Sequence, residues 1–301
     1  MNGWIVLLAA GAALGQQPRY ISDDPGAKEA IERGLRRLAE EAGAFERLAP
    51  KVFGVEKLEQ QSLVAPRRLR LSGEAPGPAI ERHELISEYG FSSFRNAPGA
   101  VREFRQVVSV DGKPVRSREK ARETLTAGMR SESDKARKKM LKDLERYGLN
   151  EGATDFGQLV LLFTGRQIRN YEFKFAGRQF VGPDSAILLE YRQGEGPDLF
   201  TVFEKREAIH QKTQGEVWLR ERDGLPLRIS LSITRRDGNL ERQYLGVVDY
   251  LQSAFGLILP ASITYREQVN GQAISETRFS YSDFRMFSAD ASVRFESEVP
   301  Q

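Results

Sequence analysis

The residues of this chain that could do chemistry are few and scattered. Its two histidines, His83 and His210, lie far apart, and each is flanked by charged or polar residues. A histidine acts as a general base when an acid orients it and a nucleophile lies within reach. Neither histidine has a serine motif, an acid in an orienting pattern or metal ligands at a suitable spacing beside it. We therefore predict that both are surface residues.

Other patterns that could support catalysis are equally weak. Carboxylate pairs such as Glu81 with Glu84, or Glu204 with Glu207, could hydrolyse glycosides, but charges on strands and loops usually face water. The glycine-containing segment 194–197 lacks the lysine and the helix start of a phosphate loop and is typical of a hairpin tip. The chain has no cysteine, which excludes disulfides, thiolate metal sites and cysteine nucleophiles. The sequence thus predicts a protein that is not an enzyme and that has no cofactor and no metal site.

One segment is strongly basic. Between Lys113 and Lys142 there are eleven basic and four acidic residues, a net charge of 11 − 4 = +7, whereas the whole chain carries +3. Lys138, Lys139 and Lys142 could dock on an anionic surface, such as lipid head groups or an acidic polymer. Alternatively, the segment is a solvated helical surface with internal pairs such as Asp134 with Lys138. Apolar residues on the same helix favour the second interpretation.

The first residues resemble an export signal. Residues 4–14 are apolar but too few to span a bilayer comfortably, and Ala13 and Gly15 precede Gln16 as in a signal-peptidase site. We predict a signal peptide at residues 1–15; the alternatives are an uncleaved membrane anchor and a buried helix. The mature protein would then be located in the periplasm or the cell envelope, and nucleic acid would not be a partner.

Residues 16–50 predict an N-terminal helix. Cap residues and Pro25 follow Ser22, and Pro50 ends the pattern. The repeat is shorter than four heptads, which favours packing on a sheet over a coiled coil with a partner. The apolar residues that recur on one face are Ile31, Leu35, Leu38, Ala42, Phe45 and Ala49.

Residues 51–301 predict a single domain built on an antiparallel sheet. The dipeptides Asp223-Gly224, Asp237-Gly238 and Asn270-Gly271 lie where tight hairpin turns are needed, between stretches of alternating apolar and polar residues. A helical insert at about 117–163 interrupts the strands, with helices expected at 117–127, 131–147 and 154–163. The predicted fold class is α+β: a curved antiparallel sheet, forming an open, incomplete β-barrel, covered in its concavity by the insert and the N-terminal helix.

Aromatic side chains on the strands and an apolar helix in the insert could line a cavity between sheet and helices, or could fill the core there. A polar N-terminus at Thr154-Asp155 and a body that is apolar nearly all round suit the last insert helix to be a plug or a lid. The candidates for ligand contact are Phe156, Leu159, Leu162, Phe163, Phe173, Trp218, Tyr250, Tyr265 and Phe279.

From about Gly215 onward, the chain resembles the periplasmic lipoprotein-carrier superfamily. The resemblance lies in the segments 215–219, 223–228 and 255–260 and in the aromatic strand that closes at Phe287. It is also similar to a group of uncharacterised exported bacterial proteins with a strand like Glu103–Val107 followed by a turn like 110–112. This resemblance implies an incomplete barrel that is covered by helices and that holds acyl chains in an apolar cavity.

Together, these observations predict an exported cell-envelope protein that binds an apolar or acyl-bearing ligand, a lipid or a lipoprotein, in the cavity between sheet and helices. An envelope protein and an anionic membrane surface are further candidate partners. The alternative is a structural or regulatory protein-interaction module with a filled core.

Overall fold

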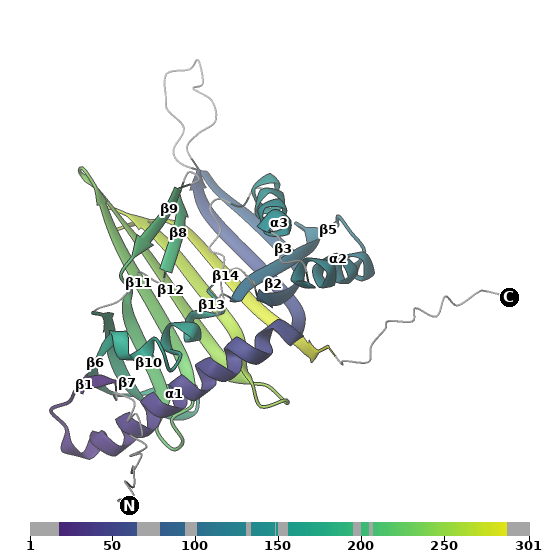
Figure 1. Ribbon diagram of the computed structural model, residues 1–301. Coiled ribbons are helices and arrows are strands. Elements are labelled where there is room, and N and C mark those ends of the chain that lie inside the picture. The colour runs from purple at the N-terminus through teal and green to yellow at the C-terminus, as the bar shows by residue number, and fades with distance from the viewer. Residues whose placement is uncertain are drawn as a thin grey trace, which may run out of the picture.

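The computed structural model of the protein describes residues 18–64, 79–93, 101–130, 134–147, 149, 156–194, 200–204 and 207–287. A curved, open sheet of twelve strands forms its centre, and a long helix crosses one face of this sheet (Figure 1). All neighbouring strands in the sheet are antiparallel except β1 and β6, which are parallel. The α+β class and the open, helix-covered sheet are the ones predicted.

The strand order across the sheet is β1-β6-β7-β10-β11-β12-β13-β14-β2-β3-β4-β5, and β8 and β9 form a separate hairpin. The strands are β1 (Arg19–Ile21), β2 (Val52–Val64), β3 (Ala79–Ser93), β4 (Val101–Val110), β5 (Lys113–Pro114), β6 (Tyr171–Val181), β7 (Asp184–Gln193), β8 (Phe200–Glu204), β9 (Glu207–Gln211), β10 (Gln214–Arg220), β11 (Pro226–Asp237), β12 (Leu240–Gln252), β13 (Ile258–Val269) and β14 (Gln272–Met286). The helices are η1 (Pro25–Ala27), α1 (Lys28–Leu48), η2 (Ala49–Lys51), α2 (Arg118–Arg130), α3 (Asp134–Arg146), η3 (Leu159–Phe163) and η4 (Ile168–Asn170), where η marks a 3₁₀-helix.

The pairing of β14 with β2 joins distant parts of the chain. β14 lies between β13, its neighbour in sequence, and β2, so that Ser275 is paired with Ser62. β2 and β3 then continue the sheet toward β4. The last described strand is therefore internal to the sheet, and both of its backbone edges are hydrogen-bonded.

The predicted hairpin turns are present. Asn270 and Gly271 both have positive φ angles, 49° and 80°, as a type I′ turn requires, and they join β13 to β14. Gly238, with φ 58°, lies between β11 and β12, and Gly224, with φ 75°, precedes β11. Only Asn270-Gly271 forms the centre of its turn as predicted, between the paired residues Val269 and Gln272. Asp237 is still paired with Leu240, so that turn consists of Gly238 and Asn239, and Asp223-Gly224 lies in the longer loop 221–225.

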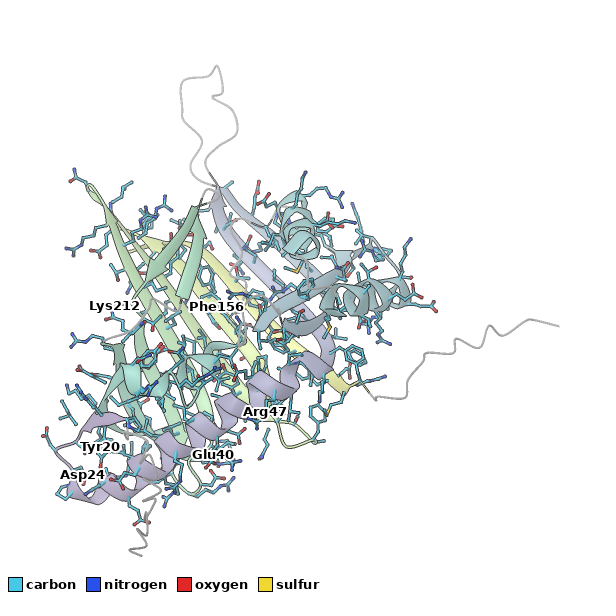
Figure 2. The ribbon with its side chains drawn as sticks, viewed as in Figure 1. Tyr20, Asp24, Glu40, Arg47, Phe156 and Lys212 are labelled. Carbon is cyan, nitrogen blue, oxygen red and sulfur yellow. The ribbon has the colours of Figure 1, made fainter. Side chains whose placement is uncertain are left out.

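α1 lies across one face of the sheet, which we call the covered face. All six residues of the predicted apolar face are buried; five of them lie on α1, and Ala49 begins η2. The helix approaches β10 closely at Gly34, where a Cβ atom would lie 2.8 Å from the Leu219 side chain. The Asp24 side chain accepts a hydrogen bond from Gly26 N at 2.8 Å and caps the short η1 turn that leads into α1. Figure 2 shows Asp24 near the start of this helical segment and Arg47 near its end.

α2 packs on the opposite, outer face, which corrects the expectation that all helices lie in the concavity. Tyr89 and Phe91 point to the covered face, where Phe91 meets Phe45 of α1 at 5.0 Å between ring centroids. Gly90 between them points outward, and a Cβ atom there would lie 2.9 Å from the Met129 sulfur of α2. α2 lies on the outer face because the apolar Phe104 side chain of β4 also points outward. Leu125 of α2 packs with Phe104 and buries it.

α3 protects the edge of β4. The backbone N–H of Arg105 faces away from β3 and donates to Met140 Sδ at 3.1 Å. Leu144 of the same helix belongs to the main apolar core. A long unpaired strand edge would be open to association with other chains, and α3 covers this one in place of a further strand.

A short strand near the start of the described chain was not predicted. β1, which pairs with β6 through residues such as Tyr20 and Phe173, is a strand where the sequence predicted only a helical region. A three-residue strand is too short to show the alternation by which strands are recognised.

The predicted signal peptide, at residues 1–15, lies outside the described residues, and so do residues 288–301. No helix in the described part of the chain is both long and apolar enough to cross a membrane.

Candidate functional site

An apolar segment without regular α-helical bonding lies on the covered face. We call residues 156–163 the plug. Its backbone bonds span three residues, from Leu159 N to Phe156 O at 3.0 Å and from Leu161 N to Gln158 O at 2.9 Å, so its last part is a 3₁₀-helix. The predicted α-helix at 154–163 is therefore wrong in type, and residues 154 and 155 lie outside the described part. Such i→i+3 bonding gives poorer hydrogen-bond geometry than an α-helix and is used in short pieces.

Phe156 occupies a gap in the sheet that glycine creates. A Cβ atom on Gly246 would lie 2.1 Å from Phe156 Cε1, so the ring rests directly on the backbone of β12. The Tyr265 ring lies 5.2 Å from the Phe156 ring, between centroids. Figure 2 shows Phe156 toward the middle of the sheet, away from the ends of α1. A side chain at position 246 would exclude the ring.

Phe163 anchors the other end of the plug among aromatic residues. Its ring centroid lies 4.9 Å from that of Tyr191, 5.2 Å from that of Tyr171 and 5.8 Å from that of Phe173. Offset and edge-to-face arrangements at these distances stabilise aromatic pairs by about 0.5–1.5 kcal/mol beyond their burial. The plug is thus held at both ends by aromatic side chains of the sheet.

Tyr250 attaches the middle of the plug by hydrogen bonds. Its hydroxyl accepts a bond from Val160 N at 3.0 Å and donates one to Gly157 O at 3.3 Å. Burial raises the pKa of Tyr250, so the hydroxyl keeps its proton at physiological pH. One phenol therefore serves as both acceptor and donor for the plug backbone.

A buried ionic cluster adjoins the plug: Glu56 of β2 and Glu103 and Arg105 of β4. Arg105 Nε lies 2.7 Å from Glu56 Oε1, and Arg105 Nη2 lies 2.9 Å from Glu56 Oε2 and 2.8 Å from Glu103 Oε2. The three side chains are at most 1% exposed. Buried charges persist when they are paired and hydrogen-bonded, as these are.

Hydrogen bonds and aromatic rings complete the cluster and connect it to the plug. Glu103 Oε1 accepts bonds from Tyr89 Oη and from Gly157 N, both at 2.8 Å. The guanidinium of Arg105 lies 5.5 Å from the centroids of the Tyr89 and Phe279 rings. Gly157 must be glycine to come this close, because a Cβ atom there would lie 2.6 Å from Glu103 Oε1. A carboxylate of the sheet thus binds the plug backbone directly.

The cluster perturbs the titration of its members. Burial raises the pKa of Glu56 despite the neighbouring guanidinium. Burial alone would lower the pKa of Arg105, but the two carboxylates outweigh it and raise that pKa well above the ordinary value. Burial also raises the pKa of Tyr89. The guanidinium therefore stays charged, and the phenol stays a hydrogen-bond donor.

This cluster was not predicted from the sequence. Glu103 and Arg105 alternate with Phe104 on β4, and such a pattern usually means that the charged residues face water. Here the charged side faces the core, because α2 covers the apolar side from outside. The one signal in the sequence was a strand that carries opposite charges two residues apart and therefore on one face.

The predicted ligand contacts are all buried, at 8% exposure or less. Eight of the nine belong to the plug or to the covered face beneath it: Phe156, Leu159, Leu162, Phe163, Phe173, Tyr250, Tyr265 and Phe279. Trp218 does not. Its ring lies on the outer face, 5.6 Å from the Arg228 guanidinium, and its Nε1 donates to Gln179 Oε1 at 3.0 Å. Strand alternation explains this placement, since Leu219, the next residue, contacts α1.

The predicted anion-docking lysines Lys138, Lys139 and Lys142 lie on α3. Lys139 and Lys142 are exposed, and the side chain of Lys138 lies outside the described part of the chain. Anion docking through these residues stays a prediction.

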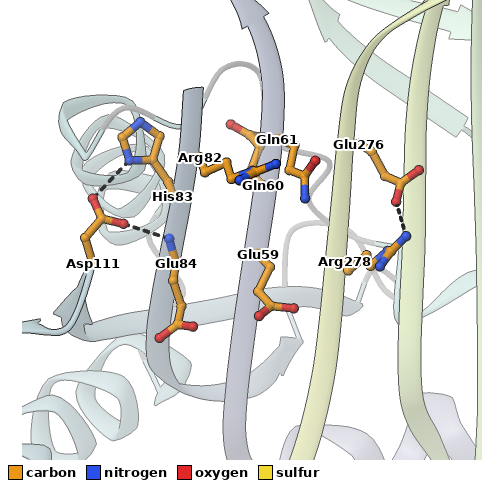
Figure 3. A pocket seen from close by; sticks show the side chains of 9 residues that line it. All are labelled: Glu59, Gln60, Gln61, Arg82, His83, Glu84, Asp111, Glu276 and Arg278. Carbon is orange, nitrogen blue, oxygen red and sulfur yellow. Dashed lines mark hydrogen bonds and ion pairs between the residues drawn. The ribbon is translucent and has the colours of Figure 1, made fainter. Parts of the chain in front are cut away.

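His83 lies in a polar depression of about 320 Å³ on β14, β2 and β3 (Figure 3). The expectation that no acid orients this histidine is wrong: His83 Nδ1 lies 3.1 Å from Asp111 Oδ2. Asp111 Oδ1 also accepts a hydrogen bond from Glu84 N at 2.8 Å. This bond, and to a smaller extent the bond to His83, lowers the pKa of Asp111. The remaining lining residues, which include no serine, threonine, tyrosine or cysteine, are Glu59, Gln60, Gln61, Arg82, Glu84, Glu276 and Arg278.

The described residues that line this depression therefore offer a hydrogen-bonded imidazole and several carboxylates, but no hydroxyl or thiol nucleophile. Asp111 has φ 49° in the turn after β4, and its two bonds fasten that turn to β3. Among the described residues, no group of three or more histidine, aspartate or glutamate side chains could hold a metal ion. The side chain of His210 lies outside the described part.

The chain resembles solved structures of the lipoprotein-carrier superfamily, as its strand and turn pattern suggested. A LolA superfamily protein from Nitrosomonas europaea is 10% identical, with 85% of this chain and 94% of that chain covered and a TM-score of 0.29. A domain from Vibrio parahaemolyticus described as outer membrane lipoprotein-sorting is 13% identical, with 86% and 94% covered and a TM-score of 0.32. A DUF1329 family protein from Desulfovibrio piger is 12% identical, with 89% and 98% covered and a TM-score of 0.35.

No protein-family model matches the sequence, and no curated protein matches it. At identities of 10–13% and TM-scores of 0.29–0.35, this likeness carries no argument about what the chain binds.

Proposed function

We propose that this is an exported, non-enzymatic protein of the cell envelope that binds an apolar or acyl-bearing ligand, a lipid or a lipoprotein, on the covered face of its sheet. The observation that carries the proposal is the plug. It is an apolar segment bound to the sheet by side chains, with no strand or α-helical pairing to hold it. A ligand of the same apolar character can therefore take its place without breaking the sheet.

The free energy gained by burying the plug side chains is similar to the free energy gained by burying an acyl chain. The plug buries the side chains of five apolar residues, Leu159, Val160, Leu162 and the two phenylalanines at its ends. Burial of such side chains stabilises by about 1.5–3 kcal/mol each, roughly 7–15 kcal/mol in all. An acyl chain of about fifteen methylenes gives about 12 kcal/mol at about 0.8 kcal/mol per methylene. An acyl chain of ordinary length can thus replace the plug at little net cost.

A second candidate, an interaction module with a filled core, is favoured by a different observation. Every predicted ligand contact is at most 8% exposed, and the aromatic residues around the plug touch one another. In that case the plug never leaves, and partner proteins bind elsewhere. The two candidates differ in one measurable property, which is saturable uptake of an apolar molecule.

The first test is native mass spectrometry of protein purified from the envelope without detergent, followed by organic extraction. We expect a stoichiometric lipid or acyl compound. A ligand-free mass, together with no uptake from added lipid, would favour the interaction module.

The second test compares two leucines of matched burial in a fluorescent fatty-acid uptake assay. Leu159 lies in the plug and is 2% exposed, whereas Leu125 lies on α2, which packs on the outer face, and is 1% exposed. We expect Leu159→Asn to lose uptake and Leu125→Asn to retain it, with the folding of both variants checked by circular dichroism. Equal uptake by both variants would place the ligand away from the plug.

A further inference from the structure

The covered face of the sheet changes from apolar to polar along its strands. Residues that are paired between neighbouring strands form rows across this face. One row is apolar on all six strands from β11 to β3, and each of its members is at most 3% exposed: Ile229, Val248, Ile263, Phe279, Leu58 and Leu85. On β12 this row lies between Gly246 and Tyr250, which both contact the plug.

The next two rows, toward the turn that joins β13 to β14, are polar on β14 and β2. Thr277 is paired with Gln60, and Ser275 is paired with Ser62. We call these four residues the polar patch. Each is at most 9% exposed, and Gln60 Nε2 donates to Thr277 Oγ1 at 3.0 Å. Hydroxyl and amide side chains both donate and accept hydrogen bonds, so the patch matches a chemical group that does the same.

The charges beside the patch disfavour an anionic group there. Glu267 of β13 is paired with Ser275 and is 7% exposed, and its Oε1 lies 2.9 Å from Arg242 Nη1. Arg235 and Arg242 are paired with each other one row beyond Glu267, outside the patch. A phosphate or a carboxylate at Ser275 would lie next to the Glu267 carboxylate and would compete with it for Arg242. An uncharged group has neither cost.

The patch adjoins one end of the plug. The Phe156 ring rests on Gly246 and lies 5.2 Å from the Tyr265 ring, between centroids, and Tyr265 is paired with Thr277. Neighbouring strands are about 4.8 Å apart, so the patch begins about one strand beyond Phe156. The other end of the plug, at Phe163, is enclosed by aromatic rings. An acyl chain in place of the plug therefore meets the polar patch at the Phe156 end.

Resting on the proposed function, we propose that the ligand is an amphiphile whose uncharged head group carries hydroxyl groups. The head group lies on the polar patch, and the acyl chain takes the place of the plug, with its methyl end toward Phe163. Hydroxyl groups of the ligand supply both donors and acceptors to Thr277 and Gln60, so these buried side chains stay hydrogen-bonded when the ligand is bound. An alkyl ester without hydroxyl groups fills the same apolar space but has no donor for the patch.

The test uses three probes with the same acyl chain: 1-dodecanoylglycerol, methyl dodecanoate and 1-dodecanoylglycerol 3-phosphate. Each is titrated against the full chain by displacement of the uncharged fluorescent dye N-phenyl-1-naphthylamine. Two net hydrogen bonds between neutral groups should make the glycerol ester bind on the order of fivefold to a hundredfold more tightly than the methyl ester. The phosphate should bind at least about tenfold more weakly than the glycerol ester, because it places like charges side by side.

Two threonine variants test where the head group lies. Thr277 and Thr213 are both 0% exposed, and each hydroxyl is hydrogen-bonded, to Gln60 at 3.0 Å and to Tyr171 at 3.1 Å. Tyr171 belongs to the aromatic rings around Phe163, so Thr213 lies at the opposite end of the plug. Thr277→Val should reduce the preference for the glycerol ester over the methyl ester by about twofold to tenfold, and Thr213→Val should leave this preference unchanged. The folding of both variants is checked by thermal unfolding, and the comparison of the three probes in the unmodified protein needs no variant.

The outcomes separate the inference from the proposed function. The expected order of the three probes, with a loss of preference in Thr277→Val alone, supports the inference. Equal binding of the two esters, tighter binding of the phosphate, or the same loss of preference in both variants overturns it and leaves the proposed function standing. If none of the probes binds, the proposed function fails, and the inference fails with it.

Discussion

Replacing Tyr250 by phenylalanine should loosen the plug while leaving the apolar core in place. The change removes one oxygen and retains the ring. That oxygen accepts from Val160 N at 3.0 Å and donates to Gly157 O at 3.3 Å, and both residues are buried. In the variant, neither backbone group has this partner, and water does not reach them without movement of the plug.

The magnitude follows from the two bonds. A buried polar group that loses its partner costs about 1–3 kcal/mol. The bond at 3.3 Å is long, so its loss should cost near the lower end of this range. The free energy of unfolding should therefore fall by about 2–4 kcal/mol in all. For a chain of this size, each kcal/mol shifts Tm by about 2 °C, which gives a decrease of about 4–8 °C. The loss should concentrate in the plug and not spread over the sheet.

The assay combines urea-induced unfolding with amide hydrogen exchange. The matched control is Tyr20→Phe, in which the same oxygen is removed from a half-buried bond to Glu32 at 3.0 Å. Because water can replace that bond, the control should lose less than about 1 kcal/mol. In Tyr250→Phe, the exchange of the Val160 amide should accelerate more than exchange in the strands. If stability and the protection of Val160 are both unchanged, Tyr250 does not hold the plug, and the reasoning from these bonds is wrong.

Three further predictions follow from the same region and from α1. Gly246→Ala should destabilise by about 1–3 kcal/mol, because a Cβ atom would meet the Phe156 ring at 2.1 Å, and Phe156→Ala in the same chain should relieve much of the loss in a double-mutant cycle of urea unfolding. Arg105→Met should cost about 3–5 kcal/mol, because two carboxylates remain buried without their cation; a loss below about 1 kcal/mol in calorimetry would mean that water reaches them. Burial raises the pKa of Glu41 above its ordinary value of 4.5, so the folded state holds this proton more tightly than the unfolded state does. This contribution to stability is present below about pH 4.5 and is lost as the pH rises through the folded-state pKa, so unfolding measured from about pH 4 to 8 should show a decrease that Glu41→Gln lacks.

The hairpin turns and the amphipathic helix could be predicted from the sequence because their causes are local. Asn270-Gly271 favours a backbone that few other dipeptides adopt, and the apolar face of α1 repeats with the helical period. The helices α2 and α3 were predicted nearly within their bounds for the same reason. Each of these elements is determined by residues within a few positions of one another.

The candidate site could be predicted only in part, because its causes are not local. Alternation shows that Trp218 and Leu219 point to opposite faces, but not which face α1 covers. Burial of Glu103 and Arg105 depends on α2 lying on the outer face and on Glu56, which belongs to a different strand far back in the sequence. The plug was identified by its composition, but the position of its Phe156 ring depends on the space that Gly246 leaves in a distant strand.

The central position of β14 has a consequence for the order in which the chain folds during synthesis. β2 and β3 can pair as soon as they are made, but the other edge of β2 has to wait for residues 272–286. At about 5–20 residues per second, roughly 200 intervening residues correspond to a delay on the order of 10–40 s. Throughout this time the unpaired edge of β2 can bind other strands. Until residues 272–286 have been made, a growing chain with this topology is therefore exposed to association through β2.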